Sequence, residues 1–222
     1  MIQPNSEIVS FSEIPALSEK AVRSVLLVRH SMRESLQNGN LDPGLTPDGH
    51  KYALECGKLL SGWQDVCCGA SMRRRTIETV RDLVRGANLP EQEIAPCPAI
   101  YDASMFTSEE DFAACLAQDN IHELLGHYFA TGNAPKMIDI EQYTAQVTSF
   151  LTSEAPAKNL LLSSHDIVIV ALLQTLKVRQ FQQDDWCGYI QGAFLSLNHD
   201  NNWQIHYAVP DKEKRQKYAL FI

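Results

Sequence analysis

The sequence predicts a three-layer α/β domain with a mostly parallel sheet and helices on both faces. Three short apolar runs, at residues 24–28, 65–70 and 159–163, have the length of strands that are buried on both faces. Helical patterns separate these runs, and this alternation is typical of a doubly wound sheet. A chain of 222 residues is long enough to form one such domain with a sizeable core.

The first 22 residues contain Pro4 and Pro15 and show little periodicity, so we expect an N-terminal extension or a short cap. The single domain is then expected over residues 23–222. The N-terminus has neither the charged start nor the apolar centre of a secretory signal, and no apolar run has the length of a membrane span. These features predict a cytoplasmic protein.

The first half of the domain contains clear signals for a loop and two helices. Residues 35–45 are rich in turn formers and predict a loop. Thr46 has the character of an N-cap, and Pro47 suits the first position of the helix that follows. Ser71 is expected to cap a second helix, which runs to about residue 85.

The second half predicts a helical insert, two further helices and a hairpin. Residues 96–137 are irregular and predict short helices that form a small side lobe, a lid or specificity insert. Residues 141–153 form an amphipathic pattern, and residues 167–176 are apolar throughout. Residues 193–197 and 203–207 flank a polar turn and predict two antiparallel strands.

Polar side chains follow each of the three predicted parallel strands. Arg29 and His30 end the first strand, Ser71 and the arginine run 73–75 follow the second, and residues 164–166 (Ser-His-Asp) end the third. Ligands of such sheets bind beyond the carboxyl ends of the strands. The sequence therefore predicts that histidines, arginines and a carboxylate meet at one edge of the sheet.

These residue types suit chemistry on a phosphate ester. The forked donors of arginine match the oxygens of a phosphate dianion, and a neutral imidazole can attack phosphorus. A positioned acid can then protonate the leaving group. Arginines are disfavoured at a helix start unless an anion compensates them, so the run 73–75 also predicts an anion nearby.

Four segments, in this order, resemble the motifs of the histidine phosphatase superfamily, which includes phosphoglycerate mutases and histidine acid phosphatases. Residues 27–31 (LVRHS) are similar to its Arg-His-Gly motif, and residues 45–49 (LTPDG) to its LTxxG helix start. Residues 71–79 (SMRRRTIET) are similar to its SxxxRxxxT segment, and residues 164–166 to its second histidine motif. The resemblance implies a phosphoglycerate mutase-like fold.

The resemblance also implies roles for the residues at the sheet edge. His30 matches the histidine that becomes phosphorylated, and Arg29, Arg75 and His165 match residues that bind the phosphoryl group. Arg33 matches an additional arginine of the acid phosphatase branch.

Two carboxylates are candidates for the proton donor. The His-Asp pair of the acid phosphatase branch favours Asp166, which we take as the first choice. In the mutase branch the donor is a glutamate in the middle of the chain, and residues 98–102 resemble that region but carry Asp102, which we keep in reserve.

One position departs from the motif, because Ser31 replaces the usual glycine. If the backbone there needed a positive φ or a close approach to phosphate, serine would be unfavourable.

We therefore expect a phosphomonoester hydrolase that acts through a phosphohistidine and needs neither a metal nor another cofactor. Its partner would be a small-molecule phosphate ester or another phosphorylated substrate. The net charge of −8 argues against binding to nucleic acid or to an anionic membrane. A phosphoglycerate mutase-like phosphotransferase and a catalytically weak phospholigand-binding protein are the alternatives.

A remote alternative is a zinc peptidase that uses His122, Glu123 and His127. The segment HELLGH resembles the zinc motif of dipeptidyl peptidase III. Histidines five residues apart lie about 140° apart around a regular helix, so zinc binding would need a distorted helix. The six cysteines form no Cys-x-x-Cys pair and are expected to be reduced.

Overall fold

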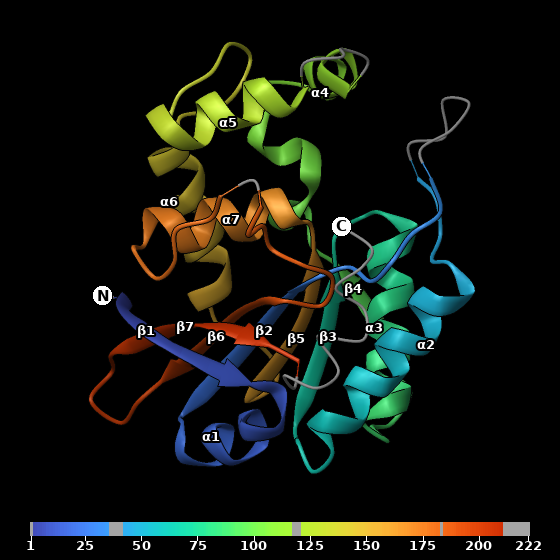
Figure 1. Ribbon diagram of the computed structural model, residues 1–222. Coiled ribbons are helices and arrows are strands. Elements are labelled where there is room, and N and C mark those ends of the chain that lie inside the picture. Colours follow the sequence, from blue (N-terminus) through green and yellow to red (C-terminus); the bar gives the residue numbers. More distant parts are fainter. Residues whose placement is uncertain (1, 36–41, 117–120, 183, 211–222) are drawn as a thin grey trace.

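The computed structural model describes residues 2–35, 42–116, 121–182 and 184–210, without the side chains of 121 and 122 (Figure 1). These residues form one seven-stranded sheet in the order β1-β7-β6-β2-β5-β3-β4. The strands are β1 (Ile2–Ser10), β2 (Arg23–Arg29), β3 (Val66–Ala70), β4 (Ile94–Pro96), β5 (Asn159–Ser164), β6 (Gly192–Leu197) and β7 (Trp203–Val209).

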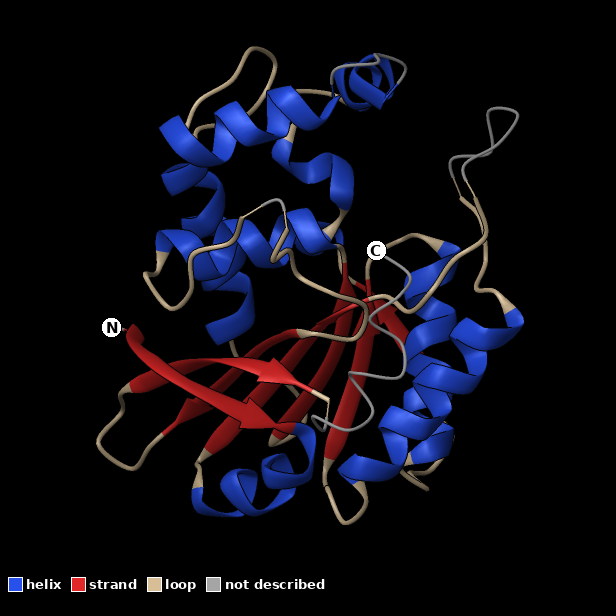
Figure 2. Cartoon of the chain, viewed as in Figure 1, coloured by secondary structure: helices blue, strands red, loops and turns tan. Residues whose placement is uncertain are grey.

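The predicted fold class is confirmed, since the sheet is mostly parallel and helices cover both of its faces (Figure 2). Only β6 runs against its neighbours, β2 and β7, while the other paired strands are parallel. Alternate residues of β2 enter two separate cores: Val25 and Leu27 pack into one, Leu26 and Val28 into the other.

The helices divide between the two faces of the sheet. One core contains side chains of α1 (Ile14–Lys20), α2 (Pro47–Gly57) and α3 (Arg74–Gly86). The other contains side chains of α4 (Glu109–Leu116), α5 (Ile121–Thr131), α6 (Ile140–Thr152) and α7 (Asp166–Thr175). Short 3-10 helices complete the set at η1 (Phe11–Glu13), η2 (Lys58–Leu60), η3 (Pro98–Ile100) and η4 (Asp102–Met105).

The carboxyl ends of three parallel strands lie next to one another, as predicted. β5 pairs with β2 on one side and with β3 on the other. The ladder continues past the strand ends, because His30 N donates to Ser164 O at 2.9 Å and Ser71 N donates to Ser163 O at 2.9 Å. The residues that follow these strands are therefore fixed relative to each other by the backbone.

Two local predictions differ from the structure. Residues 2–10, expected as an extension or cap, form edge strand β1, which pairs in parallel with β7. Proline is tolerated there because an edge strand leaves one side without ladder hydrogen bonds. The expected cap at Ser71 is wrong: α3 begins at Arg74 with Arg73 as N-cap, and the Ser71 hydroxyl lies against His165. Thr46 does cap α2, accepting from Gly49 N.

The middle of the chain forms a helical lobe on one side of the sheet, at the top of Figure 1. It consists of η3, η4, α4 and α5, which matches the short helices expected in residues 96–137. All six cysteines are free thiols. Among the residues that the structure describes, no helix is both long and apolar enough to cross a membrane.

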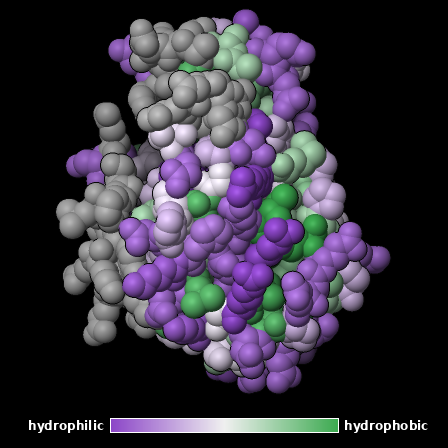
Figure 3. Space-filling model, turned by 90° about the vertical axis from the view of Figure 1, so that its right-hand side faces the viewer, coloured by the Kyte–Doolittle hydropathy of each residue, from purple (hydrophilic) through white to green (hydrophobic). Residues whose placement is uncertain are grey.

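Two glycines allow α2 and α3 to approach closely. A Cβ on Gly86 of α3 would overlap the carbonyl oxygen of Leu54, and a Cβ on Gly57 of α2 would overlap that of Leu83. The side of the molecule that carries α2 and α3 in Figure 1 is mostly hydrophilic, with some hydrophobic residues among the polar ones (Figure 3). The helix pair that carries Arg75 therefore depends on backbone contact.

We predict that Gly86→Ala lowers the free energy of unfolding by about 1–3 kcal/mol, because the added methyl group overlaps backbone. Urea denaturation followed by circular dichroism measures this change. Gly126→Ala in α5 is the matched control: its Cβ would meet nothing within 4 Å, so a neutral effect or a gain of up to about 1 kcal/mol is expected. Equal stability of Gly86→Ala and the wild type would contradict the packing.

Candidate active site

His30 lies at the centre of the sheet edge and is only 4% exposed. Its Nδ1 is 2.7 Å from the carbonyl oxygen of Ser31. A carbonyl only accepts, so Nδ1 carries the proton and Nε2 of the neutral ring keeps its lone pair. The backbone thus selects the tautomer in which Nε2 is the nucleophilic atom.

His165 lies beside His30, with 5.5 Å between the ring centroids. Its Nδ1 is 3.3 Å from Nη2 of Arg75, which can only donate. In a neutral ring, Nε2 then carries the proton and donates to the hydroxyl of Ser71 at 2.8 Å. Both ring nitrogens of His165 are therefore oriented by protein groups that come from the end of β3 and from α3.

Arg75 links His165 to the reserve carboxylate Asp102. Its Nη2 donates to Oδ2 of Asp102 at 2.7 Å, and both side chains are about 6% exposed. Oδ2 also lies 3.7 Å from Nδ1 of His165. Asp102 therefore belongs to the same buried cluster as the two histidines.

Asp166, the first choice for the proton donor, lies among other partners. Its Oδ2 is 3.2 Å from Nη2 of Arg29 and accepts from Nε1 of Trp186 at 3.0 Å. Its Oδ1 accepts from the backbone of Ile167 at 2.9 Å. These contacts give Asp166 a structural part in holding Arg29 and starting α7.

Arg29 is held at the edge of the site on several sides. Nη1 donates to the carbonyl of Cys187 at 2.7 Å, and the guanidinium lies 4.3 Å from the ring centroid of Tyr189. Its Nε is buried and has no hydrogen-bond partner among the described residues. A buried donor of this kind is unfavourable unless a ligand accepts from it.

Burial and neighbouring cations shift the titration of the cluster. Desolvation lowers the pKa of His30 and of His165 well below the usual range, and the charge of Arg75 lowers both further. Desolvation raises the pKa of Asp102 although Arg75 and Arg73 oppose it. The site thus favours two neutral imidazoles, and burial shifts the pKa of Asp102 upward from its usual value.

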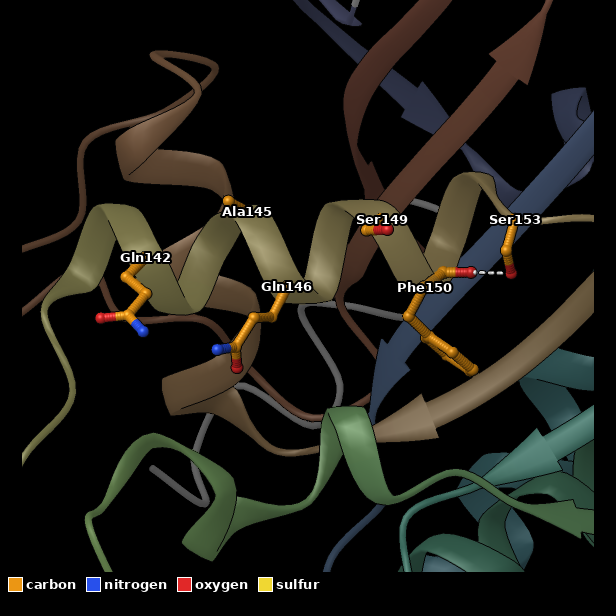
Figure 4. A pocket seen from close by; sticks show the side chains of 6 residues that line it. All are labelled: Gln142, Ala145, Gln146, Ser149, Phe150 and Ser153. Atoms are coloured by element: carbon orange, nitrogen blue, oxygen red, sulfur yellow. Dashed lines mark hydrogen bonds between the residues drawn. The ribbon is translucent and has the colours of Figure 1, made fainter.

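A pocket of about 300 Å³ adjoins the cluster, and Arg33 and Tyr189 are among the residues that line it. The ring of Tyr189 is 6.0 Å from that of His30, which places this pocket next to the candidate nucleophile. A larger depression of about 630 Å³ lies along α6 (Figure 4). Its lining side chains are uncharged, so it does not match a phosphate dianion; they are Gln142, Ala145, Gln146, Ser149, Phe150 and Ser153.

Ser31 fits its position without strain. It is not among the described residues that have a positive φ. Its hydroxyl donates to the carbonyl of Gly49 at 2.7 Å, and its backbone N donates to Thr79 Oγ1 at 2.9 Å. The serine therefore ties the His30 loop to α2 and α3, and the cost that a positive φ would impose does not arise.

The zinc alternative has no support in the described residues, among which no group of three or more His, Cys, Asp or Glu side chains could hold a metal ion. Glu123 and His127 lie on α5 and are exposed. The side chain of His122 lies outside the described part of the chain.

The structure brings His30, Arg75 and His165 together with Asp102, and it places Arg29 with Asp166 beside them. Tyr189 was not predicted to lie at the site, because it comes from a distant irregular segment with no local signal. The contact of Ser71 with His165 was not predicted either, although Ser71 begins the SxxxRxxxT segment.

Comparison with known proteins places these features in a family context. A family profile described as the histidine phosphatase superfamily (branch 1) matches residues 25–201. No curated protein sequence matches the chain.

Solved structures share the fold. A mycobacterial glucosyl-3-phosphoglycerate phosphatase is similar with a TM-score of 0.55 and 15% identity, covering 85% of this chain and 99% of that one. A phosphoglycerate mutase from Bacillus anthracis has a TM-score of 0.55 and 14% identity, with 90% and 98% covered. A phosphoserine phosphatase mutant from Entamoeba histolytica, in complex with phosphoserine, has a TM-score of 0.52 and 16% identity, covering 83% of this chain and 94% of that one. The fold is phosphoglycerate mutase-like.

We predict that stability falls as the pH drops below about 6.5, the usual pKa of histidine. In the unfolded chain His30 and His165 bind protons there, whereas their lowered pKa values keep them neutral in the folded protein. Each histidine lowers the free energy of unfolding by up to about 1.4 kcal/mol for each unit that the pH falls, until its folded-state pKa is reached. Urea denaturation at pH 7 and pH 5.5 measures the loss.

His30→Gln and His165→Gln should each reduce this loss, and the exposed His199→Gln is the control that should not. An unchanged loss in both buried variants would show that other groups cause it.

Proposed function

Because the chain belongs to the histidine phosphatase superfamily, branch 1, we propose that it hydrolyses phosphate monoesters through a phosphohistidine formed on His30. The observation that carries this proposal is the buried, neutral His30 ring, whose Nδ1 is bound to the Ser31 carbonyl. This arrangement leaves Nε2 free to attack. Arg29, Arg33, Arg75 and His165 are the proposed ligands of the phosphoryl group.

In the first step, Nε2 of His30 forms a bond to phosphorus while the bond from phosphorus to the ester oxygen breaks. The arginines stabilise the charge on the three phosphoryl oxygens. Arg75 gives up part of its contact with Asp102 when a dianion competes for Nη2.

We propose Asp102, rather than Asp166, as the proton donor. Asp102 lies 3.7 Å from His165 inside the cluster and its pKa is raised, whereas Asp166 is bound to Arg29 and Trp186. The proton of Asp102 passes to the leaving oxygen. In the second step, the Asp102 carboxylate takes a proton from water as the water oxygen bonds to phosphorus and the bond to Nε2 breaks.

His30→Ala should reduce kcat/KM for 4-nitrophenyl phosphate by more than about 10³-fold, because the nucleophile is lost. Wild-type turnover should persist in the presence of EDTA, since the proposed steps involve no metal. Tight vanadate binding without any turnover would show instead a phospholigand-binding protein. Chelator-sensitive peptide cleavage would support the zinc alternative.

Asp102→Asn should slow phenyl phosphate about 10²-fold more than 4-nitrophenyl phosphate, because a poor leaving group depends on the acid. Asp166→Asn is the matched comparison and should slow both substrates equally through Arg29. Steady-state kinetics with the two esters measures the difference. Selective slowing of phenyl phosphate in Asp166→Asn alone would return the donor role to Asp166.

A further inference from the structure

Arg73 lies outside the set of arginines expected to bind phosphate, yet it contacts the proposed proton donor. It occupies the N-cap position of α3, and its side chain is 12% exposed. Its Nε lies 3.1 Å from Oδ1 and 3.3 Å from Oδ2 of Asp102. Asp102 therefore has two cationic neighbours, Arg73 and Arg75, since Arg75 also donates to its Oδ2.

The two arginines contact the carboxylate differently. Arg75 reaches one oxygen and also contacts His165, so its position is tied to the histidine pair. Arg73 donates across both oxygens, which restricts rotation of the carboxylate about its own axis. Loss of Arg73 would leave Asp102 attached mainly through Oδ2 and through the backbone of Ala103 to Oδ1.

Aromatic rings hold the guanidinium of Arg73 in place. It lies 4.6 Å from the ring centroid of Tyr101 and 5.6 Å from that of Phe112. Such contacts stabilise a cation most when water is excluded, and both rings are buried. Arg73 is therefore fixed by groups other than the carboxylate that it contacts.

Both aromatic contacts lead to α4, in the lobe at the top of Figure 1. Phe112 is part of α4, and the hydroxyl of Tyr101 donates to Glu109 Oε1 in the first turn of the same helix at 2.6 Å. The sequence places α4 within the insert of residues 96–137, far from the strand ends. Arg73 thus connects α4 with the carboxylate of Asp102.

We propose that Arg73 is a positioning residue, which holds the Asp102 carboxyl at the angle needed for proton transfer and is itself held by Phe112 and Tyr101. This inference rests on the proposed function, because it takes Asp102 as the donor. Through Phe112 and Tyr101, the lobe would then help to hold the proposed acid in position. An arginine that only bound the phosphoryl group would affect substrates regardless of their leaving group.

Arg73 also contributes to the charge around Asp102. Its cation opposes the rise in the Asp102 pKa that burial causes, so its removal should raise that pKa further. The acid would then stay protonated to a higher pH. The titratable and charged groups around Asp102 are Arg73, Arg75, Tyr101, Tyr143 and His165.

The test compares Arg73→Met, Arg73→Lys and Phe112→Leu with phenyl phosphate and 4-nitrophenyl phosphate over a range of pH. Arg73→Met should lower kcat for phenyl phosphate at least about tenfold more than for 4-nitrophenyl phosphate, with KM changed less than about twofold. The alkaline limb of kcat for phenyl phosphate should move to higher pH. Arg73→Lys keeps the charge, so the limb should stay in place while kcat remains reduced.

Phe112→Leu leaves both arginines intact and should show the same selectivity to a smaller extent. Arg74→Met is the matched control, because Arg74 is the next residue along but is exposed and paired with Glu78. It should match the wild type. Thermal unfolding of each variant identifies any that fail to fold, and Arg73→Lys and Phe112→Leu carry the test if Arg73→Met is among them.

Two results would overturn the inference. An equal rise in KM for both esters would make Arg73 a phosphate ligand, and a profile like that of Arg74→Met would give it no role. Asp102→Asn separates this failure from failure of the proposed function. If Asp102→Asn selectively slows phenyl phosphate and Arg73→Met does not, only the inference fails. If neither Asp102→Asn nor His30→Ala alters turnover, the proposed function fails.

A double variant completes the test. In the Asp102→Asn background, Arg73→Met should cause no further slowing of phenyl phosphate relative to 4-nitrophenyl phosphate, because both changes act on the same proton transfer. Additive slowing of phenyl phosphate would mean that Arg73 acts independently of Asp102.

Discussion

The carboxyl ends of β2, β5 and β3 lie side by side at one edge of the sheet, and backbone hydrogen bonds join the residues that follow β2 and β3 to β5. His30 donates its backbone N–H to Ser164 of β5, and Ser71 donates its backbone N–H to Ser163 of the same strand. This constraint brings two histidines from distant parts of the chain to a ring separation of 5.5 Å. Each further feature of the site, from the His30 tautomer to the Arg75 contact, depends on this shared edge.

The second constraint is electrostatic. Buried cations are unfavourable unless carboxylates or ligands compensate them. Three arginines at the edge contact a carboxylate: Arg75 and Arg73 share Asp102, and Arg29 contacts Asp166. The arginine run at the start of α3 was expected to need an anion. The protein itself supplies negative charge there, since Arg74 contacts the Glu78 carboxylate and its backbone N donates to Asp42.

A bound dianion would then enter a site in which three arginines contact only two carboxylates, Asp102 and Asp166. Its phosphoryl oxygens would compete with Asp102 for Arg75, which links substrate binding to the state of the proposed donor. The arrangement also explains how a chain with a net charge of −8 can bind an anion, because the site is locally cationic.

The sequence predicted five of the seven strands, most helices and the meeting of His30, Arg75 and His165, because these follow from apolar runs and from the geometry of parallel sheets. β1 was not predicted, because an edge strand that contains Pro4 lacks a clear alternating pattern. The choice between Asp166 and Asp102 could not be made from the sequence, since it depends on side-chain directions. Tyr189 and the contact of Arg73 with Phe112 depend on irregular segments far apart in the chain, for which no local pattern exists.

Trapping of the covalent intermediate tests the central claim most directly. The wild-type protein would be mixed with a phosphate ester labelled in its phosphoryl group, quenched in alkali to preserve phosphohistidine, digested and analysed by mass spectrometry. We predict label on Nε2 of His30, formed in a burst that precedes steady-state turnover. Turnover without a labelled protein, or label on any other residue, would contradict the account.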